Sequence, residues 1–246
     1  MKLGKFVINI FLVGVFSFSL YKVSDKYISY KKADDIYLEL QEIKDNLIEG
    51  NTEGKDGYST ENGEKILDLS YINEDYCGWI TINNTNIDYP ILQGIDNEYY
   101  LRKDINKEIL ASGSIFLDYR NSGFRDKNTI IYGHNMKNST MFSQLGYFKE
   151  KDFFEKNRYI QIISPQGETL RYKIFSVYTT DANDNYLKTS FESHDDYKEF
   201  LDIIEAKSLF SSSIEVSTED KIITLSTCSY EYEDARTVVH GKLLVQ

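Results

Sequence analysis

The sequence predicts a mainly β fold, either a barrel or a sandwich, that follows an N-terminal helical segment. The chain has 20 Tyr and 14 Phe among 246 residues, and flat aromatic rings suit half-buried sheets. From Gly78 onward, short apolar runs alternate with turn residues at near-regular spacing, which is typical of barrels and sandwiches. With 41% hydrophobic residues, the chain is long enough for one sizeable core.

The first 24 residues predict a membrane anchor. Lys2 and Lys5 precede an apolar run from Phe6 to Leu20, which is at the short end for a spanning helix. Lysines on this side favour a cytoplasmic N-terminus. A cleaved signal peptide is the alternative, but residues 21–24 contain no small-x-small cleavage site. We therefore expect an uncleaved signal anchor, with the rest of the chain outside the cell.

A helical juxtamembrane segment and a flexible linker are expected over 25–63. Ile36, Leu40, Ile43 and Leu47 lie on one face of a helix spanning residues 25–49. Residues 50–63 are rich in Gly, Asn, Thr, Ser and Glu, which favours a flexible connection. The main domain is expected over 64–246, and it begins with a short helical stretch over 64–72.

Apolar runs bounded by turn residues predict the strands of this domain. They are 79–82, 87–92, 114–117, 129–132, 159–164, 170–179, 221–228 and 237–245. The segment 165–167, Pro-Gln-Gly, indicates a hairpin turn.

One helix is expected between the last strands. Ser193 can cap it, and Asp195 and Asp196 fall in its positive first turn. Its apolar stripe is Tyr197, Phe200, Leu201 and Ile204.

Charge and cysteine count exclude several function classes. The net charge of −11 argues against a general nucleic-acid binder, because phosphate would be repelled. Two cysteines are too few for a disulfide framework, a zinc finger or an iron–sulfur site. Cys77 precedes a Gly-Trp pair at the start of a strand, and we expect it to be structural.

Cys228 is the candidate nucleophile. It ends a predicted strand, and alternation puts it on the more polar face, with Thr224 and Ser226. Most free cysteines are small buried hydrophobes, so this position alone leaves a structural role open.

Arg236 stands at the start of the next predicted strand. If the two strands pair as a hairpin, Cys228 and Arg236 meet at the same rim. A guanidinium there favours the thiolate and can donate hydrogen bonds to a tetrahedral oxyanion. The alternative is an exposed arginine paired with Glu231, Glu233 or Asp234.

His134 is the best of three candidate bases. His194 begins a helix, where a solvated or capping role is expected, and His240 lies inside the last strand, where packing is expected. His134 follows a strand and Gly133, which lets the backbone turn sharply, and loops on a rigid sheet concentrate catalytic residues. Cysteine and histidine can form a thiolate–imidazolium pair or a thiol–imidazole pair, and either pair predicts acyl transfer through a thioester. No G-x-S-x-G elbow supports a serine hydrolase.

The run Thr224-Leu225-Ser226-Thr227-Cys228, followed by Arg236-Thr237-Val238-Val239, resembles the signature of the class B sortases. Further segments look like class B segments, and they are 78–80, 86–90, 96–101, 113–118 and 132–136. The resemblance extends from about Gly78 to Leu244.

This resemblance implies an eight-stranded sortase-type β-barrel with N-terminal helices and one helix, at Ser193 to Ser208, before the seventh strand. It implies a transpeptidase that cleaves a short sorting signal containing Pro and Thr in exported proteins. The acyl group is held on the cysteine and then transferred to a peptidoglycan amine. The implied partners are those exported proteins, which bear the signal at the C-terminus, the amine and the membrane, without nucleic acid.

The family's functional positions carry over to particular residues of this chain. His134, Cys228 and Arg236 match the catalytic trio. The positions near the signal peptide are Asn97, Leu101, Tyr186, Leu187, Ser226 and Thr227. Class A members can bind calcium, but neither a metal nor a cofactor is assigned here.

Two other functions use the same residues differently. A cysteine peptidase that only hydrolyses would have the same site. A membrane-tethered binding module without chemistry would have an unreactive Cys228.

Overall fold

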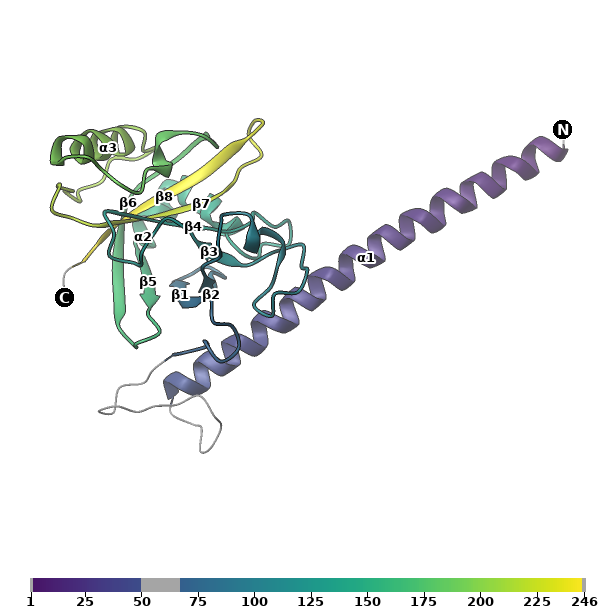
Figure 1. Cartoon of the computed structure of the whole chain (residues 1–246). Coiled ribbons are helices and arrows are strands. Elements are labelled where there is room, and N and C mark those ends of the chain that lie inside the picture. Colours follow the sequence, from purple (N-terminus) through teal and green to yellow (C-terminus); the bar gives the residue numbers. More distant parts are fainter. Residues whose placement is uncertain (1, 50–66, 245–246) are drawn as a thin grey trace.

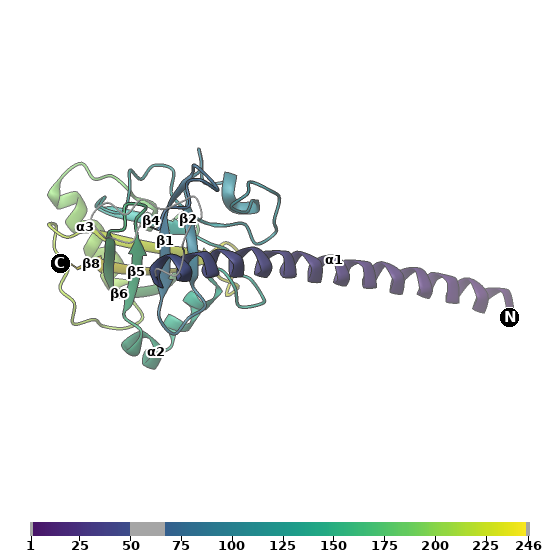
Figure 2. The same cartoon turned by 90° about the horizontal axis from the view of Figure 1, so that it is seen from below.

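The structure is a computed structural model that describes residues 2–49 and 67–244. Its body is a closed barrel of eight strands, in the order β1-β2-β3-β4-β7-β8-β6-β5. A long helix, α1 (Lys2–Glu49), passes along the barrel and projects far beyond it (Figures 1 and 2). The mainly β fold and the eight-stranded barrel are therefore confirmed.

Each predicted strand is present, within a few residues of its expected bounds. The strands are β1 (Tyr76–Ile82), β2 (Asp88–Leu92), β3 (Ile115–Leu117), β4 (Asn128–Tyr132), β5 (Tyr159–Ile163), β6 (Thr169–Asp181), β7 (Ile222–Cys228) and β8 (Ala235–Leu243). Two pairs, β2–β3 and β4–β7, are parallel, and the other neighbours are antiparallel.

The helix expected before the seventh strand is α3 (His194–Ala206). Ser193 caps it as predicted, because its Oγ accepts from the backbone N–H of Asp196 at 3.1 Å. Four short helices were not expected, since each has too few residues to show a periodic pattern. They are η1 (Tyr99–Arg102), η2 (Ser143–Lys149), α2 (Lys151–Lys156) and η3 (Asn185–Leu187).

The helix expected over 64–72 is wrong for residues 67–72, because 67–69 are irregular and 70–72 form a turn. Here Ile72 and Asn73 both donate to the carbonyl of Leu69, at 2.9 and 3.1 Å, and the chain then enters β1. Residues 64–66 and the expected linker 50–63 lie outside the described residues.

Helix α1 docks on the barrel through its second half. Leu40 and Leu47 are buried and Ile36 and Ile43 are half-buried, so the predicted apolar stripe is confirmed. Tyr37 adds a polar contact, because its hydroxyl donates to the carbonyl of Gly113 at 2.7 Å. In the first half of the helix, residues 6–25 are all exposed.

The barrel wall separates two cores. Ile223 and Leu225 of β7 point inward and pack in the main core, whereas Ile222 points outward into a second core under α3. The segment between β6 and β7, residues 182–221, therefore covers the outside of the barrel. We call it the β6–β7 connection; α3 is its helix at the upper edge of Figure 1.

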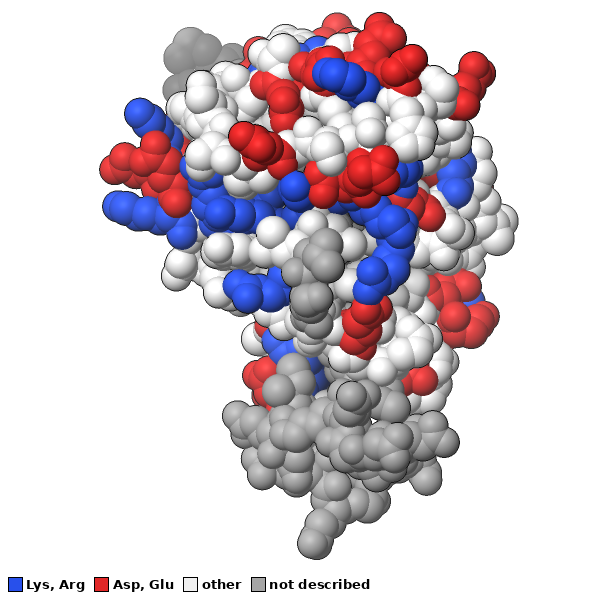
Figure 3. Space-filling view, turned by 90° about the vertical axis from the view of Figure 1, so that its left-hand side faces the viewer, with Lys and Arg blue, Asp and Glu red and all other residues white. Residues whose placement is uncertain are grey.

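The acidic net charge is unevenly distributed. Figure 3 shows a band of Lys and Arg side chains across one face, bordered by acidic groups. Lys173 of β6 and Lys242 of β8 are neighbours in the sheet. Lys242 forms an ion pair with Asp220 at 2.9 Å. The surface is therefore mixed in sign.

Buried His240 predicts a loss of stability in mild acid. Burial lowers the pKa of His240 from 6.5 to about 3, so between these values the unfolded chain binds a proton that the folded chain does not. The free energy of unfolding therefore falls as pH decreases, by about 2 kcal/mol between pH 7 and pH 5.

Urea unfolding at pH 7 and at pH 5 measures this difference in the free energy of unfolding. His240→Gln should remove most of the difference and exposed His194→Gln should retain it; an unchanged difference in His240→Gln would contradict the assignment.

Candidate active site

Strand pairing brings the three predicted catalytic residues to one rim of the barrel. Cys228 at the end of β7 lies opposite Arg236 of β8, as the hairpin prediction requires. On the other side of β7, the parallel strand β4 places Tyr132 opposite Ser226. Two residues further along each strand, His134 reaches the level of Cys228.

Hydrogen bonds fasten the chain around His134 to β7. The N–H of Gly133 donates to the carbonyl of Ser226 at 3.2 Å. The side-chain amide of Asn135 donates to the carbonyl of Cys228 at 2.8 Å. The residues on both sides of His134 are therefore held against the end of the strand that bears the thiol.

The imidazole of His134 has a defined tautomer when it is neutral. Its Nε2 lies 2.7 Å from the carbonyl oxygen of Leu101. A carbonyl only accepts hydrogen bonds, so Nε2 donates and Nδ1 keeps the free lone pair. The predicted signal-contacting residue Leu101 thus also orients the imidazole through its backbone.

Two glycines make this arrangement sterically possible. A Cβ on Gly133 would lie 2.4 Å from Cδ1 of Ile115, so space and not a sharp backbone turn requires glycine before the histidine. Gly113 has a φ of +55°, and a Cβ there would lie 2.4 Å from the carbonyl oxygen of Leu101. Both glycines permit close approach beside the imidazole.

Arg236 is half-buried and does not form the alternative ion pair. Its Nη1 donates to the carbonyls of Asp234 and Ala235, at 3.2 and 3.0 Å. Glu231 of the β7–β8 loop instead pairs with Lys149. The guanidinium therefore retains N–H groups for a ligand at this rim.

Two of the predicted signal-contacting residues meet beside Cys228. The buried hydroxyl of Tyr186 lies 3.1 Å from Oγ of Ser226, two residues before the cysteine on the same face of β7. Burial raises the pKa of Tyr186. Thr227 lies on the opposite face, and its buried Oγ1 has no hydrogen-bond partner in the described structure.

Asn97 and Leu187 are linked through Asp118 and Arg120. Nδ2 of Asn97 donates to Asp118 at 2.9 Å. Arg120 donates to Asp118 and also to the carbonyl of Leu187, at 3.0 Å. Burial alone would raise the pKa of Asp118, but hydrogen bonds from Arg120, Tyr132 and Asn97 outweigh it and lower that pKa. Asp118 and Arg120 were not singled out from the sequence as site residues, since a carboxylate–guanidinium pair two residues apart shows no recognisable motif.

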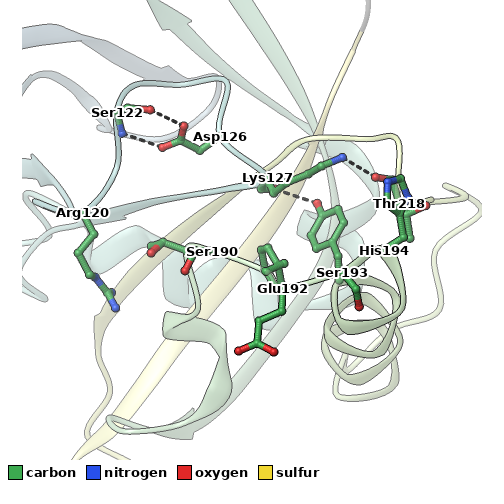
Figure 4. A pocket seen from close by; sticks show the side chains of 12 residues that line it. Arg120, Ser122, Asp126, Lys127, Ser190, Glu192, Ser193, His194 and Thr218 are labelled. Carbon is green, nitrogen blue, oxygen red and sulfur yellow. Dashed lines mark hydrogen bonds between the residues drawn. The ribbon is translucent and has the colours of Figure 1, made fainter.

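A separate cavity of about 490 Å³ lies beside the β6–β7 connection. Figure 4 shows that Arg120, Lys127, Asp126 and Glu192 line it together. Basic and acidic side chains are mixed in its lining, so the cavity favours neither anionic nor cationic ligands. The cavity does not include the thiol of Cys228.

The second cysteine lies in a different environment. Sγ of Cys77 contacts the carbonyl oxygen of Ile91 at 3.4 Å. Burial raises the pKa of Cys77 far above its ordinary value, so this thiol stays protonated and unreactive. Cys228, in contrast, lies at the end of β7 opposite Arg236.

Comparison with known proteins decides the family. The family described as the sortase domain matches residues 80–244. The chain belongs to the sortase family. It is 38% identical to Sortase B of Listeria monocytogenes over 100% of both chains. It is 35% identical to Sortase B of Staphylococcus aureus, covering 97% of this chain and 96% of the relative.

Solved structures agree with this class B assignment. Sortase B of Clostridium perfringens has a TM-score of 0.69 and 43% identity, covering 72% of this chain and 98% of that one. A Staphylococcus aureus sortase B–substrate complex has a TM-score of 0.76 and 33% identity, covering 88% and 98%. Class B sortases are cysteine transpeptidases, so this chain is an enzyme of that kind.

Proposed function

We propose that this sortase cleaves a sorting signal containing Pro and Thr in exported proteins and transfers the acyl group to a peptidoglycan amine. Cys228 is the nucleophile, His134 the proton partner and Arg236 the stabiliser of negative charge. The observation that supports this most strongly is the strand register, with Cys228 opposite Arg236 and His134 two residues beyond the β4–β7 pair Tyr132–Ser226.

The reaction has two balanced halves. The Cys228 thiolate attacks the scissile carbonyl carbon, and the oxyanion that forms accepts hydrogen bonds from Arg236. His134 gives a proton to the departing amine, the C–N bond breaks, and a thioester remains. The acceptor amine then attacks the thioester and loses a proton to His134, and the thiolate leaves.

The signal peptide would lie beside the rim, against Asn97, Leu101, Tyr186, Leu187, Ser226 and Thr227. An acceptor amine must compete with water at the thioester, so the groove has to orient it. The three side chains supply the nucleophile, the proton transfers and the charge stabilisation, so these steps need no cofactor.

A membrane location accompanies this function. By length and composition α1 is able to cross a membrane, and residues 6–23 are all exposed. We place the anchor at 1–24 with its N-terminus inside, the juxtamembrane segment and linker at 25–63, and the catalytic domain at 64–246 outside the cell.

Product analysis tests the proposal. The full chain in detergent is incubated with a sorting peptide, with and without a peptidoglycan amine, and the products are weighed by mass spectrometry. We expect amide product that increases with amine concentration. Hydrolysis alone at high amine concentration would favour the peptidase. A Cys228 that resists thiol-reactive electrophiles would favour the binding module.

Arg236→Ala should lower kcat/KM by roughly 10²-fold, about 3 kcal/mol of transition-state stabilisation. Arg236→Lys keeps the charge but loses the planar fork, so it should recover only part of the rate. Peptide cleavage kinetics measure both. Arg171→Ala, on an exposed side chain of β6, is the matched control and should match the parent enzyme. Parent-like kinetics for Arg236→Ala would remove Arg236 from the mechanism.

A further inference from the structure

Four buried polar side chains cross the outer face of the barrel beneath the β6–β7 connection. They are Tyr178 on β6, His240 on β8, Thr224 on β7 and Asn128 on β4, and each is at most 2% exposed. We call them the buried polar chain. Thr224 lies directly opposite His240 across the β7–β8 pair, so adjacent strands hold consecutive members side by side.

Asn128 holds the part of the connection that contains Leu187. Its Nδ2 donates to the carbonyl of Tyr186 at 3.1 Å and to the carbonyl of Lys188 at 2.9 Å. These are the carbonyls on either side of Leu187. An amide nitrogen has two N–H groups, and both are used here.

The remaining hydrogen bonds can run in only one direction. Thr224 Oγ1 lies 2.6 Å from Oδ1 of Asn128, which only accepts. The single hydroxyl proton of Thr224 is therefore used, so His240 Nδ1, at 2.9 Å, must donate to Oγ1. In the neutral ring Nε2 then accepts from the hydroxyl of Tyr178, at 2.9 Å.

These hydrogen bonds fix the orientation of the Asn128 side-chain amide, with its nitrogen toward the β6–β7 connection and its oxygen toward Thr224. If the amide were flipped, two carbonyl oxygens would face Oδ1 and both would lose their donor, which is costly for buried groups. Burial keeps His240 neutral, since its pKa is lowered to about 3, and a neutral ring is what the chain of donors requires.

We propose that Asn128 is a positioning residue for substrate recognition, held in orientation by the rest of the buried polar chain. By fixing the carbonyls of residues 186 and 188, it places Tyr186 and Leu187 beside Cys228. The hydroxyl of Tyr186, 3.1 Å from Oγ of Ser226, is the contact that reaches the active rim. This inference rests on the proposed function, because it takes these residues as contacts of the sorting signal.

Kinetics of Asn128→Ala and Asn128→Asp test the positioning role. Both variants should raise KM for the sorting peptide about tenfold or more, since two buried carbonyls lose their donors. Alkylation of Cys228 by iodoacetamide, which needs no peptide contact, should stay within about twofold of the parent rate. An unchanged KM in either folded variant would overturn the proposal.

Asn157→Ala is the matched control. Asn157 is also a buried amide that donates to a backbone carbonyl, that of Phe153 at 3.0 Å, but it lies in another segment. Its KM should stay at the parent value. If Asn128→Ala does not fold, Thr224→Val keeps the shape and removes only the hydroxyl, and it should raise KM about threefold. A parent-like KM in Thr224→Val would then count against the proposal.

Two measurements on the full chain do not depend on activity. The nitrogen spectrum of His240 should show the Nδ1–H tautomer at neutral pH, and an Nε2–H tautomer would overturn the chain of donors. Hydrogen exchange at residues 185–188 should be faster in Asn128→Ala than in the parent, and equal rates would overturn the positioning role. If the parent cleaves no sorting peptide, the proposed function fails. The His240 tautomer and the exchange rates at 185–188 would still show whether Asn128 holds the β6–β7 connection in place.

Discussion

A Cys228→Ala variant is expected to release no detectable product from a sorting peptide and to form no thioester. Without the thiol, the described rim lacks the nucleophile that forms the thioester. The loss should be on the order of 10⁴-fold or more in kcat. Mass spectrometry of the protein and the peptide, with and without the amine, measures both the product and the acyl-enzyme.

Cys77→Ala is the control for this experiment. Cys77 is the other thiol of the chain, but it lies against Ile91, and burial keeps it protonated. Its removal should leave turnover within about twofold, because it takes no part in acyl transfer. Retained cleavage by Cys228→Ala would exclude Cys228 as the nucleophile, and lost cleavage by a folded Cys77→Ala would contradict the passive role of Cys77.

A His134→Ala variant should lose nearly as much activity, about 10³-fold in kcat/KM, because both half-reactions need a proton transfer. Alkylation of Cys228 by iodoacetamide at neutral pH should also slow, since the imidazole that assists the thiol is gone. The two readouts together distinguish loss of the proton partner from loss of peptide binding, which would affect turnover only.

His194 provides the comparison, because it is an exposed histidine at the start of α3. His194→Ala should keep parent turnover and parent alkylation. If His134→Ala also kept both, the base would have to be sought elsewhere on the rim. A normal alkylation rate with lost turnover would show that His134 does not activate the thiol, and its role would then lie in peptide binding or in proton transfer to the leaving amine.

Local patterns predicted most of the secondary structure. Alternating apolar runs identified all the strands, and the Ser193 cap with its apolar stripe identified α3. The closed order of the strands could not be read from periodicity, because the parallel pairing of β4 with β7 joins segments far apart in the chain. That part of the prediction came from the family resemblance. Residues 67–72 were wrongly expected to be helical, and they form a turn before β1.

The pairing of Cys228 with Arg236 could be predicted from the sequence more directly than the position of His134. Cys228 and Arg236 belong to consecutive strands, so a hairpin already predicted that they face each other. The approach of His134 depends on β4–β7 pairing, and the family motif rather than the local pattern indicated it. Asn128 was missed entirely, since a polar residue at a strand start resembles an ordinary turn residue until its partners at 186 and 188 are visible.

With the apolar part of α1 in a membrane, as proposed above, the unbroken helix would hold the enzyme at a fixed distance from the lipid surface. Between Leu20, at the end of the apolar run, and Ala33, the first buried residue of the docked half, the helix is almost entirely exposed. At about 1.5 Å per residue, this interval would hold the barrel about 20 Å above a bilayer. Each residue inserted there would move the catalytic rim about 1.5 Å further from the bilayer and rotate it by about 100° around the helix axis. In that arrangement, the number of residues between Leu20 and Ala33 would set both the height and the orientation of the barrel relative to the lipid surface.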